Sequence, residues 1–293
     1  MTAGTIVKAL SGFYYVNTDC GLIECRARGK FRLDGISPLV GDRVDVTLDQ
    51  NGKGTVDIIH ERKNSFVRPA VANIDCMVIL ASAVNPITDP FLIDRVTALA
   101  ENAGCEPVIC INKTDLNSGD KLYEIYATTG YTVLRTSAAT GEGINELKAA
   151  IKGKLCAFAG NSGVGKSSLL NALAPELEIK VGEVSDKLGR GRHTTRHVEI
   201  FSLGGEAFIA DTPGFGSFDI EKMEHIPKEN LQYSFREFAP YIGKCRFDDC
   251  AHIKEPGCAI IAAVEKGVIS PSRHESYARL YDLASQIKDW ELK

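Results

Sequence analysis

The chain has 293 residues, a formal net charge of −4 and a sequence pI near 5.9. With 44% hydrophobic and 25% charged residues, its composition is that of a folded protein, which excludes wholesale disorder. The slightly acidic balance excludes a uniformly basic surface, so any contact with nucleic-acid phosphates must be local. No apolar run approaches the ~20 residues that span a bilayer and no signal-peptide pattern opens the chain, so we expect a cytoplasmic protein without a membrane partner. We also expect a monomer.

The first 68 residues carry short β-like runs separated by Gly, Asp and Asn turn signals, which favours a small β-barrel. The expected strands are 5–7, 12–16, 22–27, 43–48 and 55–59. Within this segment Arg26, Arg28, Lys30 and Arg32 recur at every second position. On an extended segment these four cations would point the same way. They predict either a solvated strand face or a phosphate-binding stripe.

Residues 69–220 alternate longer apolar runs with amphipathic helices, which predicts an α/β domain whose parallel sheet is covered on both faces. The expected strands are 76–81, 107–111, 132–136, 155–159, 197–203 and 207–210. The expected helices lie near 91–103, 119–129 and 144–152.

A phosphate-binding loop follows the strand at 155–159 and fits G-x-x-x-x-G-K-[ST] at every fixed position. Its glycines let backbone N–H groups turn around a phosphate chain at a helix N-terminus. Lys166 would reach the β- and γ-phosphates, and Ser167 would offer its hydroxyl to Mg²⁺. A strand before the loop and a helix-forming run after it argue against a chance glycine-rich loop. The expected nucleotide-binding residues are Gly160, Asn161, Ser162, Gly163, Val164, Gly165, Lys166, Ser167 and Ser168.

A guanine-reading loop, Asn112-Lys113-Thr114-Asp115, follows the strand at 107–111 and matches N-K-x-D. An ionised Asp115 can accept hydrogen bonds from the guanine N1–H and exocyclic amine, a donor pair that adenine lacks. Asn112 would tie this loop to the phosphate loop, and Lys113 would lie over the base. After the next strand, Ser137 and Ala138 supply backbone N–H groups for the guanine carbonyl oxygen. A surface Asn-Lys turn is the alternative, which the placement at a strand end disfavours.

Two switch segments, residues 189–196 and 211–214, are expected to hold Mg²⁺ and the γ-phosphate. Asp211-Thr212-Pro213-Gly214 follows the strand at 207–210, so Asp211 would hold Mg²⁺ through water and the Gly214 N–H would meet the γ-phosphate. The loop at 189–196 bears two threonines, of which Thr195 is favoured over Thr194 as a Mg²⁺ ligand. The guanine-reading loop precedes the phosphate loop, the reverse of the usual order, so the domain is predicted to be circularly permuted. Close domain termini allow such a rearrangement to keep the pocket.

The tail, residues 221–293, contains three cysteines and a histidine within fourteen positions, in the pattern C-x₄-C-x-H-x₅-C. These are Cys245, Cys250, His252 and Cys258. They form the ligand set of a closed, structural Cys₃His zinc site for one ion. A pair of disulfides is the alternative, disfavoured by the odd cysteine count. The other six cysteines are interpreted as small buried hydrophobes. A terminal helix is expected to start at Ser270-Pro271-Ser272, with Ser272 and Glu275 as a capping box.

Together, the permuted motif order, the G-R-H-T-T-R loop, the Cys₃His tail and the N-terminal barrel resemble the ribosome small-subunit-dependent GTPase A family of bacteria, over essentially the whole chain. The resemblance implies an OB-fold barrel, a permuted GTPase domain and a zinc domain, acting in late maturation of the small ribosomal subunit. It also implies that barrel and zinc domain contact ribosomal RNA, which would make the cations at 26–32 phosphate contacts.

Phe215 stands where many GTPases place a water-orienting Gln, and it cannot hydrogen-bond to water. The resemblance offers His193 as the catalytic replacement, since an imidazole can polarise or position a water. The alternative is an exposed loop histidine.

The leading hypothesis is a GTPase that binds an immature small subunit with GTP and leaves after hydrolysis. The alternatives are a passive RNA-docking module whose conformation GTP or GDP sets, and a GTPase serving a membrane or protein partner.

Overall fold

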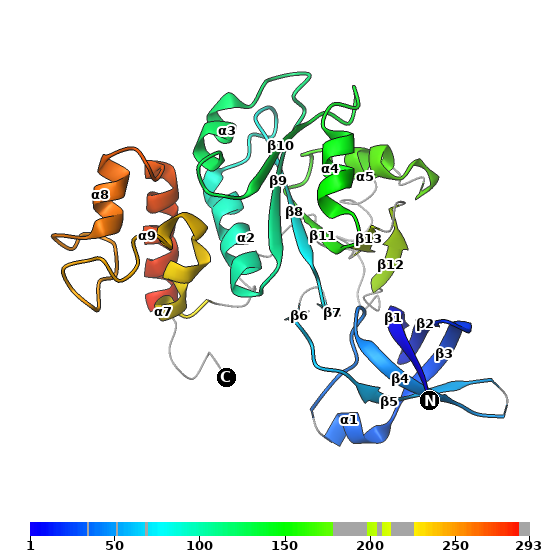
Figure 1. Cartoon of the computed structure of the whole chain (residues 1–293). Coiled ribbons are helices and arrows are strands. Elements are labelled where there is room, and N and C mark those ends of the chain that lie inside the picture. Colours follow the sequence, from blue (N-terminus) through cyan, green and yellow to red (C-terminus); the bar gives the residue numbers. More distant parts are fainter. Residues whose placement is uncertain are drawn as a thin grey trace.

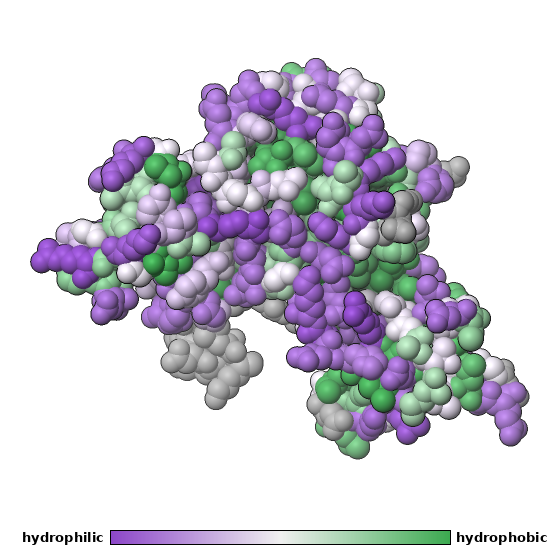
Figure 2. Space-filling view, viewed as in Figure 1, coloured by the Kyte–Doolittle hydropathy of each residue, from purple (hydrophilic) through white to green (hydrophobic). Residues whose placement is uncertain are grey.

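The computed structural model of the chain describes residues 1–33, 35–50, 52–67, 70–177, 198–203, 207–211 and 226–286. Figure 1 shows an N-terminal barrel, a central α/β domain and a helical C-terminal module, the last two lying side by side. Figure 2 shows hydrophilic residues spread over the visible face, with apolar residues in small separate groups. No helix in the described ranges has the length and hydropathy of a membrane span.

The N-terminal unit is a five-stranded barrel of the OB type. Its strands follow the order β1-β2-β3-β5-β4, and β1 also pairs with β4, which closes the barrel. Strands β3 and β5 run parallel and the other pairs are antiparallel. The elements are β1 (Thr2–Leu10), β2 (Phe13–Thr18), β3 (Gly21–Ala27), α1 (Gly29–Leu33), β4 (Arg43–Leu48) and β5 (Gly54–Ile59). The expected barrel is therefore confirmed.

The cations at 26–32 do not form one extended stripe, so that expectation was wrong. Strand β3 ends at Ala27 and α1 begins at Gly29, which places Lys30 and Arg32 on a helical turn. The turn brings Phe31 into the apolar core, where it is only 6% exposed. Arg28 forms an ion pair with the buried Asp57, and thus holds the start of the helix to the barrel.

The barrel is joined to the central domain at two places. At the first, the Ala72 N–H of β7 (Ala70–Ala72), which pairs with β6 (Ser65–Val67), donates to the Val40 carbonyl oxygen at 2.8 Å. Asn73 Nδ2 donates to the Gly41 carbonyl oxygen at 2.9 Å beside it. At the second, β1 pairs with β12 (Val198–Ser202), and Lys8 forms a 2.9 Å ion pair with Glu199. Because of this pairing, the barrel strands and the central strands form one continuous sheet.

The central sheet has the order β10-β9-β8-β11-β13-β12, parallel except for β12. Its residues alternate between two apolar cores: Met77 and Ile79 join the core that contains α2 and α3, and Val78 and Leu80 join the core of α4 and α5. Figure 1 shows these helix pairs on opposite faces of the sheet, as expected. The elements are β8 (Cys76–Ser82), α2 (Pro90–Asn102), β9 (Glu106–Asn112), α3 (Asp120–Tyr126), β10 (Thr132–Thr136), α4 (Ile144–Ile151), β11 (Leu155–Ala159), α5 (Lys166–Leu173), η1 (Pro175–Leu177) and β13 (Phe208–Asp211).

The C-terminal module is helical and packs around Phe235, Phe238 and Tyr277, with ring centroids 4.9–5.3 Å apart. The helices are α7 (Lys228–Leu231), η3 (Gln232–Ser234), η4 (Arg236–Phe238), α8 (Ala259–Glu265) and α9 (Pro271–Ser285). The expected capping box at Ser272 was wrong, because Ser270 is the N-cap residue of α9. Pro271 occupies the first helical position, where its fixed φ and missing N–H cost nothing, and so Ser272 already lies inside the helix.

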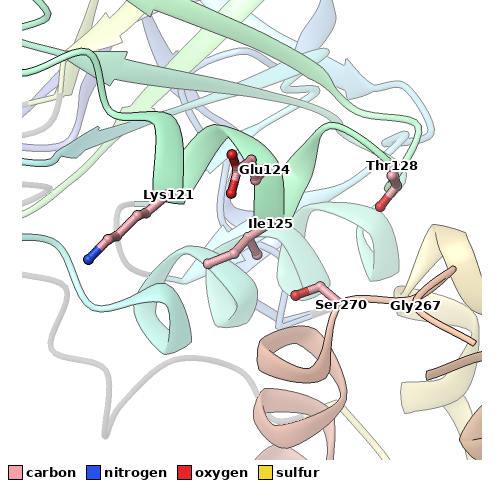
Figure 3. Close-up of a pocket in the computed structure, with 6 residues that line it drawn as sticks. All are labelled: Lys121, Glu124, Ile125, Thr128, Gly267 and Ser270. Atoms are coloured by element: carbon pink, nitrogen blue, oxygen red, sulfur yellow. The ribbon is translucent and has the colours of Figure 1, made fainter. Parts of the chain in front are cut away.

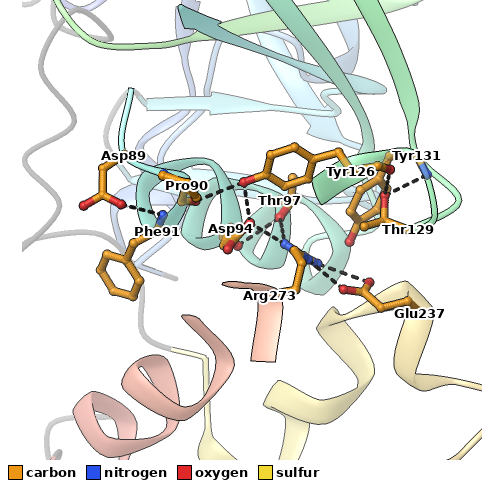
Figure 4. A network of polar contacts seen from close by, with 10 residues as sticks. All are labelled: Asp89, Pro90, Phe91, Asp94, Thr97, Tyr126, Thr129, Tyr131, Glu237 and Arg273. Carbon is orange, nitrogen blue, oxygen red and sulfur yellow. Dashed lines mark hydrogen bonds and ion pairs between the residues drawn. The ribbon is translucent and has the colours of Figure 1, made fainter. Parts of the chain in front are cut away.

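A buried ion network fastens this module to the central domain (Figure 4). Arg273 of α9 is fully buried and donates to Asp94 of α2 at 2.7 Å and to Glu237 at 2.7 Å. Asp94 also accepts from the Tyr126 hydroxyl at 2.7 Å, which adds α3 to the network. Burial raises the pKa of the Asp94 carboxyl, and the Arg273 guanidinium opposes that shift. The described part of the module is therefore held to the central domain by an interior contact.

Alongside this network, a cavity of about 430 Å³ lies between α3 and the segment that enters α9 (Figure 3). None of its lining residues is among those expected to bind a nucleotide or a metal. They are Lys121, Glu124, Ile125, Thr128, Gly267 and Ser270.

Of the six cysteines interpreted as buried hydrophobes, Cys25, Cys76, Cys105, Cys110 and Cys156 are buried. For Cys20 the interpretation was wrong: it is exposed, in the turn between β2 and β3.

Candidate nucleotide site and metal centre

The loops expected to bind a nucleotide start at one edge of the central sheet. Strands β8, β9, β10 and β11 are parallel, so their carboxyl ends share that edge. Asn112, the last residue of β9, is paired in register with Ser82 of β8 and with Thr136 of β10. The guanine-reading loop, the Ser137-Ala138 turn and the phosphate loop therefore leave the sheet as neighbours.

The phosphate loop has the backbone that its glycines predict. Gly163 and Gly165 have φ values of 82° and 95°, in the left-handed region that glycine tolerates best. Gly165 is the N-cap residue of α5, which starts at Lys166. Across the loop, Ser162 and Gly163 are exposed, Val164 is buried, and Asn161, Lys166, Ser167 and Ser168 are half-buried.

Asn112 joins the guanine-reading loop to the phosphate loop. Its side-chain amide donates from Nδ2 to the Val164 carbonyl oxygen at 2.8 Å, and its Oδ1 accepts from the Thr136 hydroxyl at 3.2 Å. Asn112 is only 2% exposed, so both bonds are shielded from water. Its contact is close, since a Cβ on Gly165 would lie 2.5 Å from Nδ2. The guanine-reading loop and the phosphate loop, about fifty residues apart in the chain, are thus held together.

Asp115 lies beside the turn that follows β10. The buried Ser137 hydroxyl donates to Asp115 Oδ1 at 2.6 Å, which fixes the carboxylate while its residue stays exposed. Ala138, the residue after Ser137, is half-buried. A carboxylate held in this way can present its free lone pairs to a pair of N–H donors.

Thr114 and Glu142 are a further pair in this corner of the site. The Thr114 hydroxyl is 2.8 Å from Glu142 Oε2 and 3.0 Å from the Thr136 carbonyl oxygen. Sequence reasoning missed Glu142, which lies five positions after Ser137 in no recognised motif. Only the tertiary contact reveals it.

The residues expected to act on the γ-phosphate are not tested by the structure. Asp211 is the last residue of β13, and its side chain lies outside the described residues. Gly214, Thr195, Thr194 and His193 also lie outside the described residues.

The four predicted zinc ligands come together in the C-terminal module. The ligand atoms of Cys245, Cys250, His252 and Cys258 all lie within 4.8 Å of one another. Cys245 Sγ is 3.8 Å from Cys258 Sγ, and each of these sulfurs is 3.5 Å from His252 Nδ1. A tetrahedron with Zn–S of about 2.3 Å and Zn–N of about 2.0 Å has S–S edges of about 3.8 Å and S–N edges of about 3.5 Å. The residues present therefore fit a zinc ion.

The surroundings of His252 prepare it as a ligand. Its Nε2–H donates to Gln232 Oε1 at 2.9 Å, which leaves the Nδ1 lone pair facing the thiols. Burial lowers the pKa of His252, which keeps the imidazole neutral, as metal binding requires. Glu255 supports the same turn by accepting backbone N–H bonds from Ala251, Ile253 and Lys254. Neither Gln232 nor Glu255 was found from the sequence, because neither belongs to the ligand spacing.

The fold and the site define a class: a P-loop nucleotide-binding domain whose guanine-reading strand precedes its phosphate-loop strand, between a barrel and a Cys₃His module. Comparison with known families agrees with this class. Residues 59–221 match the family described as RsgA GTPase, and residues 3–56 match the one described as RsgA N-terminal domain. The chain belongs to the RsgA GTPase family, a family of GTP hydrolases.

Relatives and solved structures extend the similarity over nearly the whole chain. "Small ribosomal subunit biogenesis GTPase RsgA" of Caldanaerobacter subterraneus is 47% identical over 280 residues, 94% of each chain. The protein of the same name from Geobacillus thermodenitrificans is 45% identical over 283 residues, 94% of this chain and 95% of that one. The crystal structure of YjeQ from Thermotoga maritima matches with a TM-score of 0.82 at 36% identity, covering 98% and 99% of the two chains. YloQ, described as a circularly permuted GTPase, matches with 0.79 at 33% identity, covering 98% and 96%.

Proposed function

We propose that the protein binds an immature small ribosomal subunit in its GTP state, hydrolyses GTP, and is then released. The observation that carries the nucleotide part is the 2.8 Å bond between Asn112 and the Val164 carbonyl, which holds the guanine-reading and phosphate loops together. The ribosomal part is supported by relatives at 45–47% identity that carry the name small ribosomal subunit biogenesis GTPase. A factor acting on ribosomal subunits would work in the cytoplasm, and we expect a monomer.

The base and phosphates would be bound by different loops. Asp115, oriented by Ser137, would accept from the guanine N1–H and amine, and the backbone N–H groups of residues 160–168 would surround the phosphates. Lys166 would stabilise the charge that develops on the β- and γ-phosphate oxygens. In the reaction a water oxygen forms a bond to the γ-phosphorus as the bond to the β–γ bridging oxygen breaks, giving GDP and inorganic phosphate.

Mg²⁺ and the attacking water would be held by the switch segments. Ser167, Thr195 and Asp211 (through water) are the proposed Mg²⁺ ligands, and His193 is the proposed positioner of the water. Mg²⁺ would neutralise charge on the β- and γ-phosphates.

The proposed division of labour follows the three units: residues 1–68 and 221–293 would contact ribosomal RNA, and residues 69–220 would hydrolyse GTP. For the RNA contact, Arg26 lies over the Phe13 ring at 4.6 Å and Lys30 over the Phe31 ring at 5.2 Å. Such cations can contact phosphates locally despite the net charge of −4. Zinc would hold the C-terminal surface in shape rather than take part in catalysis.

Phosphate release with and without purified small ribosomal subunits tests this proposal. We expect strong stimulation by the subunit, since a partner can contribute about 10³–10⁵-fold in phosphoryl transfer. His193→Ala should lose the stimulated rate while its affinity for GDP stays within about twofold of the unmodified protein. Absence of stimulation at physiological salt would contradict the role on the ribosome. Full stimulation in the His193 variant would remove only that residue's assignment.

A further inference from the structure

The segment that joins β8 to α2 touches both nucleotide loops, although no motif marks it. We call residues 83–88 the bridging loop. The Lys113 ammonium donates from Nζ to the backbone carbonyl oxygen of Asn85 at 2.8 Å. On the other side, Pro86 lies beside the exposed Gly163: a Cβ built on this glycine would lie 3.2 Å from Pro86 Cδ. One short segment therefore contacts the guanine-reading loop and the phosphate loop.

A buried clasp holds the bridging loop at its two ends. The Ser82 N–H donates to the Thr88 hydroxyl at 2.9 Å, and the Thr88 N–H donates back to the Ser82 carbonyl at 2.9 Å. The Val84 N–H donates to the Ser82 hydroxyl at 3.2 Å, and that hydroxyl donates to the Val84 carbonyl at 3.0 Å. Ser82 and Thr88 are 0% and 1% exposed, so water cannot replace these partners. The position of the Asn85 carbonyl thus depends on the clasp.

The hydrogen bond of the ammonium to Asn85 favours one course for the aliphatic part of Lys113. Lys113 has a left-handed φ of 67°. Its Cε lies 4.0 Å from where a Cβ on Gly165 would be, so the stem runs beside the end of the phosphate loop. A free lysine side chain loses rotamer freedom when it packs on a ligand, but one already held by a hydrogen bond has lost that freedom beforehand.

We propose that the bridging loop is a positioning element for guanine nucleotides, and that Thr88 is its key residue. Through Asn85 it presets the Lys113 stem against which the base packs, and through Pro86 it holds the phosphate loop at Gly163. Thr88 itself touches no nucleotide and acts by closing the clasp. The proposal rests on the proposed function of this site in binding GTP, and it adds a residue that lies in neither loop.

Thr88→Val tests the proposal, because it keeps the shape of the side chain and removes the hydroxyl that accepts the Ser82 N–H. Binding of GDP and of a non-hydrolysable GTP analogue should weaken by about tenfold or more, with KM raised and the intrinsic kcat within about twofold. Thr88→Ser keeps the hydroxyl and should restore affinity.

Thr97→Val is the matched control. Thr97 is also fully buried, on the helix that follows the bridging loop, but its hydroxyl serves Arg273 at 3.2 Å, away from the nucleotide loops. This variant should lose stability, measured by unfolding without nucleotide, and keep its nucleotide affinity.

The outcomes distinguish a failure of the proposed function from a failure of this inference alone. If the unmodified protein binds neither GDP nor the GTP analogue, the proposed function falls, and this inference with it. If the unmodified protein binds and Thr88→Val binds as well as Thr97→Val does, only the inference is overturned. The inference is likewise overturned if Thr88→Ser is as weak as Thr88→Val. Should Thr88→Val not fold, Lys113→Met serves instead: a loss of about tenfold supports the proposal, and unchanged affinity overturns it.

Discussion

Replacing Arg273 with Met should loosen the C-terminal module from the central domain. The Arg273 guanidinium is 0% exposed and bonds Asp94, Thr97 and both carboxylate oxygens of Glu237, at 2.7 to 3.2 Å. Met fills a similar volume, so the change removes the charge and the hydrogen bonds with little loss of packing. Two acidic side chains would then share a buried site without their cation.

The expected free-energy cost of the substitution follows from these unpaired buried carboxylates. Removing one partner of a buried ion pair costs about 3–5 kcal/mol. Part of this cost is relieved by protonation, because burial already raises the pKa of Asp94 and the loss of Arg273 removes the opposing effect. We therefore expect the opening of α9 to become easier by about 3 kcal/mol.

Hydrogen exchange of the α9 amides measures that opening free energy directly. Arg279→Met is the matched control on the same helix, since Arg279 is exposed and lies over the Phe91 ring at 3.8 Å. It should cost about 1 kcal/mol or less. Adding Asp94→Asn to Arg273→Met should recover part of the loss, because the unpaired carboxylate is then gone. Equal effects of the two arginine variants, or a change below about 1 kcal/mol for Arg273→Met, would refute the reasoning.

Three further perturbations test other parts of the structure. Cys258→Ser should lower the zinc content measured by atomic absorption from one ion per chain, and should destabilise the C-terminal module, since the closed site loses a ligand. Gly165→Ala should weaken GDP binding by about tenfold or more, because the new Cβ would lie 2.5 Å from Asn112 Nδ2. Thr47→Val should destabilise the barrel at pH 7 in thermal unfolding. The Thr47 hydroxyl bond is the main cause that lowers the pKa of Asp57, so this stabilisation is present above the unfolded pKa of about 3.9 and is lost as the pH falls through the folded value.

Each of these three variants has a control or a result that would contradict its prediction. Cys20→Ser, at an exposed cysteine outside the cluster, should leave the zinc content unchanged; a full zinc complement in Cys258→Ser would contradict the ligand assignment. Gly153→Ala shares the positive φ of Gly165 but has open space around its Cβ, so it should keep GDP affinity. If the stability difference between Thr47→Val and the unmodified protein is the same at pH 7 and pH 3, the ionisation of Asp57 is not what the Thr47 bond stabilises.

Motifs allowed the sequence to predict much of the site, because their spacing is set by local chemistry. The glycine positions of the phosphate loop and the Cys₃His spacing each follow from the geometry of one ligand. The strand ends at Thr136 and Ala159 were placed correctly because a polar motif follows a buried run directly.

Contacts between distant segments that carry no motif could not be predicted in this way. The bond of Asn85 to Lys113 and that of Gln232 to His252 join residues 28 and 20 positions apart and leave no spacing pattern. The cation stripe failed for a related reason: alternation was read as a strand, whereas burial of Phe31 in the barrel core favours a helical turn. Local pattern was overridden there by packing.

The central claim is that Asp115 selects guanine, and the measurement that tests it most directly is the nucleotide preference of the unmodified protein and of Asp115→Asn. The unmodified protein should bind GTP at least about 10³-fold more tightly than ATP or xanthosine triphosphate. The variant should prefer xanthosine triphosphate, because an amide N–H can donate to the carbonyl that replaces the guanine amine. A preference for ATP in the unmodified protein, or an undiminished preference for GTP in the variant, would contradict the account.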